Sequence, residues 1–383
     1  MRVAVVVDNP NYFGGGNKFA SDLIKMLKMY NHDVALCAWE KPVEGKCYES
    51  FLDIEDVYLP SFLTKKIKGK LWKIAFASSS AIKKCMKKFK PNIIINANVE
   101  PAAFRGIKAA KKVFYCHFPT ELKVYKHTLL YLLYRVPYWF WHYKEIESID
   151  AIICNSYYTK NIAYLCWKHH VPKDKFHVIY PAVDISAFRR EIRREEKICY
   201  VGRIDANKGI DYAIDAFLEV YNKINISLEI VGGVSGRESV RYYEGILKPR
   251  VDALQRKGFP IKLEVNVPYS RIAETLLSSK AMVSFNPEEH FGIVPVEAQA
   301  AGCPPIVARG GGQLETVKHC ETGFLVENPQ EISSYLVALL EDNKLWLKIS
   351  ESARKWASKF SLENIAREWD ALLSSLSSEV PTG

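Results

Sequence analysis

Residues 286–326 read NPEEHFGIVPVEAQAAGCPPIVARGGGQLETVKHCETGFLV, and the fold can be worked out from this stretch. Glu289 and Glu297 flank a Phe-Gly pair, and Gly292 can adopt a backbone conformation that other residues avoid. A helix that begins after Gly292 would present free N–H groups and the positive end of its dipole, which together bind anions such as phosphate. The stretch therefore predicts a helix over residues 293–301 with an anion site at its start.

The two glutamates suggest what else this site binds. Glu297, one turn into the predicted helix, can accept hydrogen bonds from a diol such as a ribose, and Glu289 can bind hydroxyl groups on the other side of the phosphate. A molecule with hydroxyl groups on both sides of a diphosphate is a nucleotide sugar. Two glutamates alone are equally typical of an acidic loop followed by an ordinary amphipathic helix.

The whole pattern is more specific than its glutamates. E-x-F-G-x-x-x-x-E, followed by G-x-P-x-I, a glycine-rich turn and T-G-F-L-V, resembles the donor-binding signature of family 4 glycosyltransferases. The resemblance implies the GT-B fold, an α/β architecture of two Rossmann-like, doubly wound parallel-sheet domains that face a central cleft. It also implies a retaining enzyme that uses a nucleotide-linked hexose and neither a metal ion nor another cofactor. By the same resemblance Glu289 is catalytic, and the donor contacts in this stretch are Phe291, Gly292, Ile293 and Glu297.

Length and composition agree with a two-domain globular protein. The chain has 383 residues, of which 48% are hydrophobic and 25% are charged. Its nine cysteines include no C-x-x-C pair, which argues against a disulfide or metal framework and for a reducing compartment. The first residues lack the features of a signal peptide, and the apolar run 129–143 is interrupted by Arg135 and Pro137. We therefore expect a cytoplasmic protein, or one that lies peripherally on the cytosolic face of a membrane.

The positive charge is concentrated in the first half. Residues 1–190 hold 30 Lys and Arg against 16 Asp and Glu, whereas the remaining residues hold 23 against 27. Residues 61–90 contain ten lysines and no acid. Apolar residues recur there at helical spacing, at Leu63, Ile67, Leu71 and Ile74. Such a segment can lie on an anionic membrane or guide a diphosphate-bearing acceptor, and the alternative is a solvated lysine face over a core helix. No recognised nucleic-acid-binding motif accompanies the charge, so a nucleic-acid partner is not predicted.

The N-terminal residues predict the opening of a doubly wound sheet. An apolar run at residues 3–7 precedes the glycine loop Gly14, Gly15 and Gly16, and a helix follows. Such a loop is also compatible with a dinucleotide-binding fold, but the G-x-G-x-x-G pattern is absent. In family 4 enzymes the matching loop approaches the donor phosphates and the acceptor. Lys18 stands where many relatives carry an acid or another polar residue.

His117 lies at the end of a predicted strand, residues 113–119, where open α/β sheets bind ligands. A single histidine beside aromatic residues is more often packed than catalytic. However, the motif H-x-P at a strand end resembles the family 4 mannosyltransferases that build lipid-linked oligosaccharides at the cytosolic face of the endoplasmic reticulum. That resemblance implies that His117 is catalytic and lies beside the transferred sugar. Residues 151–155 are interpreted as the last parallel strand of this first domain.

The second half repeats the pattern after the charged run 189–197, which we interpret as a linker. The predicted domains are residues 1–190, the acceptor- and membrane-facing domain, and residues 191–360, the donor domain. A terminal helix at about 361–383 is assigned to the first domain by resemblance.

Two cations follow the first strand of the second domain. Arg203 and Lys208 are suited to hold a diphosphate, although their spacing alone is also typical of solvated surface charges. In the family the motif G-R-x-x-x-x-K-G holds the donor diphosphate, so the resemblance makes both residues catalytic and donor-binding. Gly232, in the strand-like segment 228–233, is a further predicted donor contact.

These observations predict a retaining glycosyltransferase that moves a hexose, with mannose favoured, from GDP-mannose or a UDP-hexose to an acceptor hydroxyl. The favoured acceptor is a lipid-linked glycan. The alternatives are a GT-B enzyme with a soluble glycan or small-molecule acceptor, and a non-catalytic protein that binds sugar nucleotides.

Overall fold

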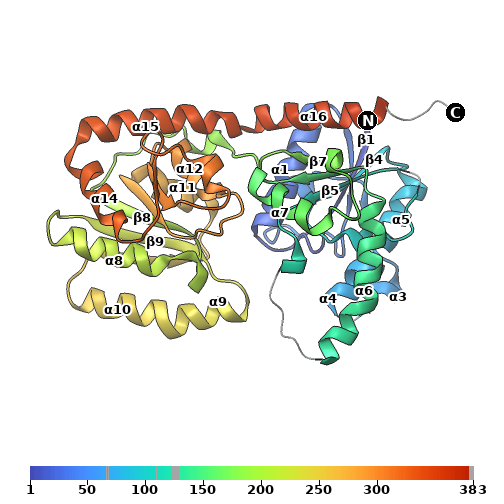
Figure 1. The fold of residues 1–383 in the computed structure, drawn as a ribbon, viewed down its shortest axis with the longest axis horizontal. Coiled ribbons are helices and arrows are strands. Elements are labelled where there is room, and N and C mark those ends of the chain that lie inside the picture. Colours follow the sequence, from blue (N-terminus) through green and yellow to red (C-terminus); the bar gives the residue numbers. More distant parts are fainter. Residues whose placement is uncertain (66, 68, 109, 123–128, 379–383) are drawn as a thin grey trace. The chain divides into compact units, whose positions relative to one another are not determined.

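The computed structural model describes residues 1–378 apart from 66, 68, 109 and 123–128. The chain folds into two compact units. Met1–Ala182 and the tail from Leu362 onward form the first unit, and Val183–Ser361 form the second. Each unit has a parallel sheet with helices on both faces, which is the doubly wound α/β arrangement that the sequence predicts (Figure 1).

The first sheet has seven strands among the described residues, all parallel, in the order β3-β2-β1-β4-β5-β6-β7. The strands are β1 (Arg2–Val6), β2 (Asp33–Cys37), β3 (Val57–Tyr58), β4 (Ile93–Asn96), β5 (Lys111–Cys116), β6 (Ala151–Cys154) and β7 (Phe176–Val178). The prediction that residues 151–155 form the last strand is wrong, because β7 pairs in parallel with β6. β7 has only three residues, and only one of them is buried, so its sequence carries little strand signal.

Helices cover both faces of this sheet and give it two apolar cores. One core joins side chains of β1, β4 and β5 to α1 (Gly15–Met29) and to the C-terminal helix α16 (Leu362–Ser378). Trp369, Leu373 and Leu376 of α16 are buried there, and burial of such a side chain contributes about 2 kcal/mol. The C-terminal helix therefore packs on the first unit, as the resemblance implied.

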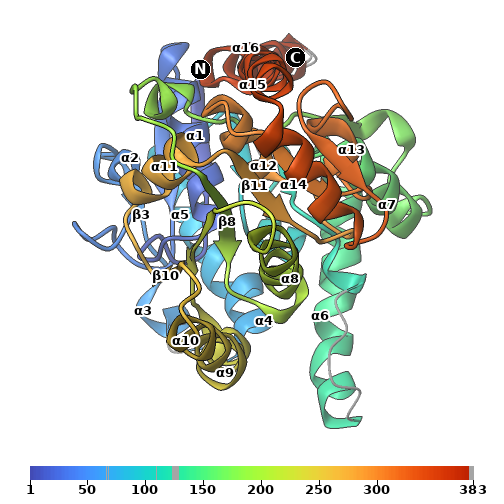
Figure 2. The ribbon, with the colours of Figure 1, turned by 90° about the vertical axis from the view of Figure 1, so that its left-hand side faces the viewer.

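The other core joins the opposite face of the sheet to α5 (Ser79–Lys88), α6 (Leu129–Glu147) and α7 (Tyr157–Trp167). The remaining helices of this unit are α2 (Glu49–Leu52), α3 (Phe62–Lys65) and α4 (Lys70–Lys73), followed by a π-helical turn at Ile74–Ser78. α6 extends away from the sheet in both views (Figures 1 and 2). No helix in the described part of the chain is both long and apolar enough to cross a membrane.

The basic segment 61–90 consists of several short helices rather than one. α3 and α4 are separate, and α4 begins after Gly69, whose φ is +90°. Ile74 is buried in the core, whereas the Leu63 side chain is 80% exposed. The predicted apolar stripe is therefore divided between the core and the surface.

The second sheet has six strands among the residues described, all parallel, in the order β10-β9-β8-β11-β12-β13. They are β8 (Lys197–Arg203), β9 (Ser227–Gly233), β10 (Ile261–Val265), β11 (Ala281–Ser284), β12 (Pro305–Ala308) and β13 (Phe324–Val326). One face packs against α8 (Ile210–Tyr221), α10 (Lys248–Arg256), α14 (Glu331–Glu341) and α15 (Asn343–Ala357). α11 (Tyr269–Ser278) and α12 (Ile293–Ala300) lie over the opposite face, and the short helices are α9 (Gly236–Tyr242) and α13 (Gln313–Thr316).

Both strand orders reverse direction at one point, which is where sheets of this kind bind ligands. In the first sheet the reversal lies between β1 and β4, and in the second it lies between β8 and β11. The loops that leave the carboxyl ends of these strands are therefore the places to look for a site.

Candidate active site

The donor loop, residues 285–292, joins β11 to α12 beside the reversal point of the second sheet. Gly292 caps the helix with a φ of +87°, a left-handed conformation that strains any residue with a Cβ atom. α12 begins directly after it, so the first N–H groups of the helix point back toward the loop. The predicted helix at residues 293–301 is confirmed, and its N-terminus has the polarity that binds an anion.

Three glycines pack directly against the backbone of this loop. Cβ atoms added at Gly310, Gly311 and Gly312 would lie 2.4, 2.1 and 2.3 Å from the backbone oxygens of Pro287, Glu289 and His290. The Gly312 N–H donates a hydrogen bond to the Glu289 carbonyl at 2.7 Å. Only glycine permits this close approach. The glycine-rich turn after β12 therefore determines where the backbone of the donor loop lies. The sequence revealed the turn, but it did not reveal what the turn supports.

Glu289 forms an ion pair across the reversal point. Lys208 lies in the turn after β8, and its Nζ is 2.6 Å from Glu289 Oε2. Asn286 Nδ2 donates to the same oxygen at 3.2 Å. Burial raises the pKa of Glu289, but the charge and hydrogen bonds of Lys208 and Asn286 outweigh it and hold the pKa below its ordinary value. Glu289 is therefore ionised at neutral pH, and Asn286 is a contact that the sequence analysis missed.

Arg203, the last residue of β8, remains largely in solvent. Its side chain is 58% exposed, and its Nε lies 3.8 Å from the Asp205 carboxylate. Gly209 follows Lys208 with a φ of +69°, and a Cβ atom there would lie 2.1 Å from the Phe285 carbonyl oxygen. This close approach brings the turn that carries Lys208 against the donor loop and leaves the Arg203 guanidinium available at the same edge.

Glu297 lies on α12 and is 6% exposed. Tyr269, the first residue of α11, donates its hydroxyl hydrogen to Glu297 Oε1 at 2.8 Å. The carboxylate is thus oriented by a neighbouring helix, which the sequence analysis did not foresee because the two residues are far apart in the chain.

The other predicted contacts of the second unit have clear packing roles. Phe291 is buried and packs edge-on against Phe360, with ring centroids 5.8 Å apart, while Ile293 is half-buried at the start of α12. A Cβ atom at Gly232 would lie 2.1 Å from the Gly202 carbonyl oxygen. Gly232 is therefore required by the pairing of β8 with β9, at the same carboxyl edge as the ion pair.

The first unit has its own cluster at the reversal point of its sheet. Gly14 caps α1 in an extended conformation, Gly15 has open space where a side chain would be, and a Cβ atom at Gly16 would meet Asn98 at 3.2 Å. Asn98, from the loop after β4, bridges the Asp8 backbone N–H at 3.0 Å and the Asn17 side chain at 2.8 Å. This polar network, also missed from the sequence, ties the glycine loop to the neighbouring strand end.

Two charged residues, Asp8 and Lys18, lie on either side of the glycine loop in the chain. Burial raises the pKa of Asp8, and nearby Lys70 and local hydrogen bonds oppose that effect only in part. Lys18 forms an ion pair with Asp22, one helical turn further along α1, at 2.5 Å. Lys18 is thus engaged along its own helix.

His117 follows β5 and is held in a defined orientation. Its Nε2 lies 2.8 Å from the Ala97 carbonyl oxygen, and because a carbonyl can only accept, Nε2 carries the hydrogen. The ring stands edge-on to Phe19 and Tyr115, and Asn155 Nδ2 donates to the His117 carbonyl at 3.1 Å. His117 and the glycine loop thus share the carboxyl edge of the first sheet.

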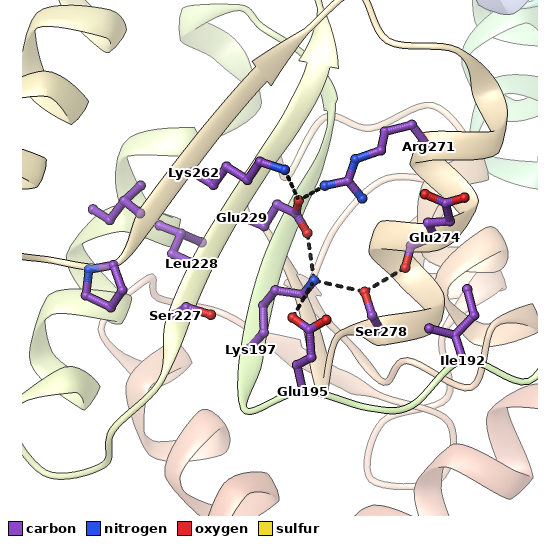
Figure 3. Close-up of a pocket in the computed structure, with 12 residues that line it drawn as sticks. Ile192, Glu195, Lys197, Ser227, Leu228, Glu229, Lys262, Arg271, Glu274 and Ser278 are labelled. Atoms are coloured by element: carbon purple, nitrogen blue, oxygen red, sulfur yellow. Dashed lines mark hydrogen bonds and ion pairs between the residues drawn. The ribbon is translucent and has the colours of Figure 1, made fainter.

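A cavity of about 570 Å³ lies at the opposite, amino edge of the second sheet (Figure 3). Glu229 stands at its centre, and Lys197, Lys262 and Arg271 all contact the Glu229 carboxylate. Arg194, from the charged run 189–197, donates to the backbone carbonyls of Leu276, Ser279 and Ala301, and Lys197 is buried. Part of the predicted linker is therefore anchored in the second unit. The charges at this edge are matched to one another.

The grouping of possible metal ligands gives no indication of a metal centre. Within the described ranges, no three or more His, Cys, Asp and Glu side chains are grouped so that they could hold a metal ion.

Family models match both halves of the chain. Residues 13–187 match the model described as Glycosyltransferase Family 4, and residues 184–356 match the model described as Glycosyl transferases group 1.

Similar proteins include eukaryotic mannosyltransferases. The alpha-1,3/1,6-mannosyltransferase alg-2 of Neurospora crassa is 30% identical in an alignment of 257 positions, and the match covers 58% of this chain and 54% of that protein. The human alpha-1,3/1,6-mannosyltransferase ALG2 is 28% identical in an alignment of 285 positions, and the match covers 68% of this chain and 67% of the human protein. The matches thus span about half to two thirds of the length of these relatives.

Solved structures of similar fold cover nearly the whole chain. A glycosyltransferase from Rickettsia africae superposes with a TM-score of 0.74 at 19% identity and covers 99% of both chains. Anabaena HepE in complex with UDP and glucose gives a TM-score of 0.74 at 19% identity over 98% of this chain and 100% of that chain. The paired Rossmann-like units are thus the GT-B fold. The two family models, which together span residues 13–356, show that the chain belongs to the family 4 glycosyltransferases.

Proposed function

We propose that this protein is a retaining hexosyltransferase that moves mannose from a nucleotide sugar to a hydroxyl of a lipid-linked glycan. The observation that carries the proposal is the Lys208–Glu289 ion pair at the reversal point of the second sheet, with Arg203 exposed beside it. The N-terminus of α12 adds a site for phosphate at the same edge.

The cations of this site stabilise the leaving diphosphate. As the bond between the sugar C1 and the diphosphate oxygen breaks, negative charge grows on the diphosphate and positive charge grows on the sugar. Arg203, Lys208 and the N–H groups after Gly292 stabilise the diphosphate, and preorganised donors of this kind typically contribute a hundredfold or more to the rate. The acceptor oxygen bonds to C1 on the face that the diphosphate leaves, and its proton passes to the departing diphosphate.

Two carboxylates and one histidine position the donor. Glu289, ionised and held by Lys208 and Asn286, accepts hydrogen bonds from the hexose hydroxyls. Glu297, held by Tyr269, accepts from the ribose diol. His117 and the Gly14–Gly16 loop, which belong to the first unit, contact the hexose and the phosphates in the same reaction.

The similarity to the mannosyltransferases favours mannose, and GDP-mannose is the donor we propose first. UDP-hexoses are the second choice, because solved structures of similar fold are described as bound to UDP and UDP-glucose. A lipid-linked acceptor would bring the protein to the cytosolic face of a membrane, and the basic segment 61–90 of the first unit is the proposed contact.

A transfer assay with the full chain tests the proposal. GDP-mannose, UDP-glucose and UDP-N-acetylglucosamine are each offered with a short-chain isoprenoid diphosphate glycan and, separately, with the free glycan. We expect a product one mannose heavier from GDP-mannose and the lipid-linked glycan, with an α-linkage by NMR and undiminished yield in chelator. Transfer to the free glycan alone would favour a soluble acceptor. Donor-induced thermal stabilisation without turnover of any donor would identify a non-catalytic binding protein.

A further inference from the structure

A second polar cavity lies on the first unit, away from the carboxyl edge of its sheet. It has a volume of about 280 Å³ and is lined by Phe76, Ser79, Ser80, Lys83, Lys84, Lys87 and Arg105. The serines and lysines recur at intervals of three and four residues, so they share one face of α5. The opposite face of α5 packs in the core through Ala81, Ile82 and Cys85. Core packing therefore fixes the orientation of the helix that carries the cavity.

Aromatic rings hold Arg105 in place. Its guanidinium carbon lies 4.6 Å from the centroid of the Phe76 ring and 4.5 Å from that of Trp141. The two rings stand edge to face, with centroids 5.5 Å apart. Stacking against both rings fixes the guanidinium plane while leaving its N–H donors for a ligand. The π-helical turn at Ile74–Ser78 places Phe76 in this position, and such turns are frequent at functional sites.

The four cations of the cavity lack a carboxylate partner among the residues that the structure describes. In those ranges, no acidic oxygen lies within 4.0 Å of the charged atoms of Lys83, Lys84, Lys87 or Arg105. Glu145 approaches the loop that follows Arg105, but it accepts from the Gly106 N–H at 3.4 Å and pairs with Lys112 at 3.6 Å. Several like charges around one cavity repel each other unless an anion joins them. The cavity therefore has the charge of an anion site.

Exposed apolar residues neighbour residues that contact the cavity lining, and we infer that they form its rim. The Ser80 hydroxyl accepts from the Ser61 N–H at 3.0 Å, which brings the next two residues, Phe62 and Leu63, to the edge of the cavity. Their side chains are 71% and 80% exposed. Phe140, the residue before Trp141 in the chain, is 67% exposed. A small soluble anion would make no use of such a rim, whereas a phosphate attached to a lipid brings apolar surface with it.

We propose that this cavity binds the phosphate headgroup of an anionic lipid, with a phosphomonoester as the preferred group. Arg105 provides a planar pair of donors for two phosphate oxygens, and the lysines provide point charges around the remaining oxygens. Ser80, which accepts from Ser61, still has its own hydrogen to donate. Phe62, Leu63 and Phe140 enter the interfacial layer. The inference rests on the membrane-facing part of the proposed function and does not depend on the transfer reaction.

Vesicle co-sedimentation with the full chain tests the site. Vesicles of phosphatidylcholine contain either phosphatidic acid, a monoester, or phosphatidylglycerol, a diester, at contents adjusted to equal surface charge. We expect at least tenfold tighter binding to the phosphatidic acid vesicles. The variant Lys83→Gln/Lys84→Gln/Lys87→Gln should lose that preference and bind at least tenfold more weakly. Equal binding to both vesicle types would overturn the proposal, because diffuse charge would then account for the attraction.

Two control variants separate a built site from net charge. Lys25→Gln/Lys46→Gln/Lys168→Gln removes the same charge from exposed positions of the first unit and should change binding less than twofold. The single changes Lys87→Gln and Lys88→Gln differ by one position on α5, but only Lys87 lines the cavity, so only Lys87→Gln should weaken binding. Equal losses in the matched variants would contradict the proposal.

A last pair of measurements distinguishes a lipid from a free ion. Phe62→Ser/Leu63→Ser should weaken vesicle binding severalfold without changing the thermal shift produced by inorganic phosphate. A saturating thermal shift with phosphate but no vesicle binding would overturn the lipid assignment. Transfer to a short-chain, water-soluble acceptor should be unchanged in all these variants. A failure of the transfer assay would therefore count against the proposed reaction alone, and a failure of vesicle binding against this inference alone.

Discussion

The two edges of the second sheet carry charged residues in very different states. At the amino edge the Glu229 side chain is 3% exposed and contacts Lys197 and Arg271, with Lys262 at 3.7 Å. Burial raises the pKa of Glu264 there, but its pairing with Lys262 and Arg271 outweighs that effect and lowers the pKa below its ordinary value. Figure 3 shows Lys197, Lys262 and Arg271 converging on the Glu229 carboxylate.

At the carboxyl edge the central ion pair is more accessible than the Lys197–Glu229 pair, whose side chains are 9% and 3% exposed. The Lys208 and Glu289 side chains are 20% and 26% exposed, and Arg203 points largely into solvent. A charge that is fully surrounded by partners has no bonding capacity left for a ligand and acts on stability. A charge that keeps part of its surface in water can exchange that water for a ligand. We therefore propose that the charges of the amino edge serve stability and those of the carboxyl edge serve donor binding.

The largest effect is expected for Glu289→Gln. The amide oxygen can still accept a hydrogen bond from Lys208, but it carries no negative charge to pair with the ammonium, and it binds a sugar hydroxyl more weakly than a carboxylate does. We expect kcat/KM for transfer to fall about 100- to 1,000-fold. Glu288→Gln, an exposed neighbour in the same loop, should remain within twofold of the native protein. Native transfer by Glu289→Gln would remove this carboxylate from the proposed mechanism.

Glu229→Gln tests the opposite edge. It leaves the buried Lys197 and the half-buried Arg271 with less negative charge beside them, which should lower the free energy of unfolding by about 3 kcal/mol. Urea denaturation measures this loss, and transfer below the unfolding transition should stay within twofold. Glu274→Gln is the matched control, because Glu274 lines the same cavity without an ion pair among the described residues. A native unfolding curve for Glu229→Gln would show that these ion pairs do not stabilise the unit.

Gly311→Ala should affect both stability and donor binding, because it displaces the donor loop. Its Cβ atom would lie 2.1 Å from the Glu289 carbonyl oxygen at a φ of +56°, so the loop must move. We expect a loss of about 2 kcal/mol in stability together with at least tenfold weaker donor binding. Gly258→Ala has a φ of +89° with open space around it, and it should lose about 1 kcal/mol and leave donor binding unchanged. Unaltered donor affinity in Gly311→Ala would show that donor binding does not depend on the position of this loop.

Tyr269→Phe should give the smallest effect. It removes one hydrogen bond to Glu297 and keeps the ring against Phe188, at a cost of about 1 kcal/mol. The KM for the donor should rise about fivefold while kcat is unchanged. Tyr221→Phe, whose ring packs with Phe217 and Phe259, should have no effect on KM. A change in kcat alone would mean that Glu297 acts in the chemical step rather than on the ribose.

The amino edge also shows why some contacts escape sequence reasoning. Glu229 lies inside the apolar run LEIVGG, and a glutamate in such a run is a signal that could have been noticed. Its partners start neighbouring strands or another helix, and no local pattern links positions 197, 229, 262 and 271. The same holds for Arg105, which is fixed by rings from residues 76 and 141.

The sequence by itself determined the alternation of strands and helices, the helix after Gly292 and the family signature around Glu289. These are local properties, because the apolar period, glycine conformation and motif spacing are set within a few residues of the chain. Only the tertiary structure decided that Gly310–Gly312 support the donor loop, that Lys208 holds Glu289, and that Tyr269 orients Glu297. Those contacts form when strand order brings distant loops to one edge of a sheet. Their energies depend on desolvation and on distances of a few ångströms, which no local pattern encodes.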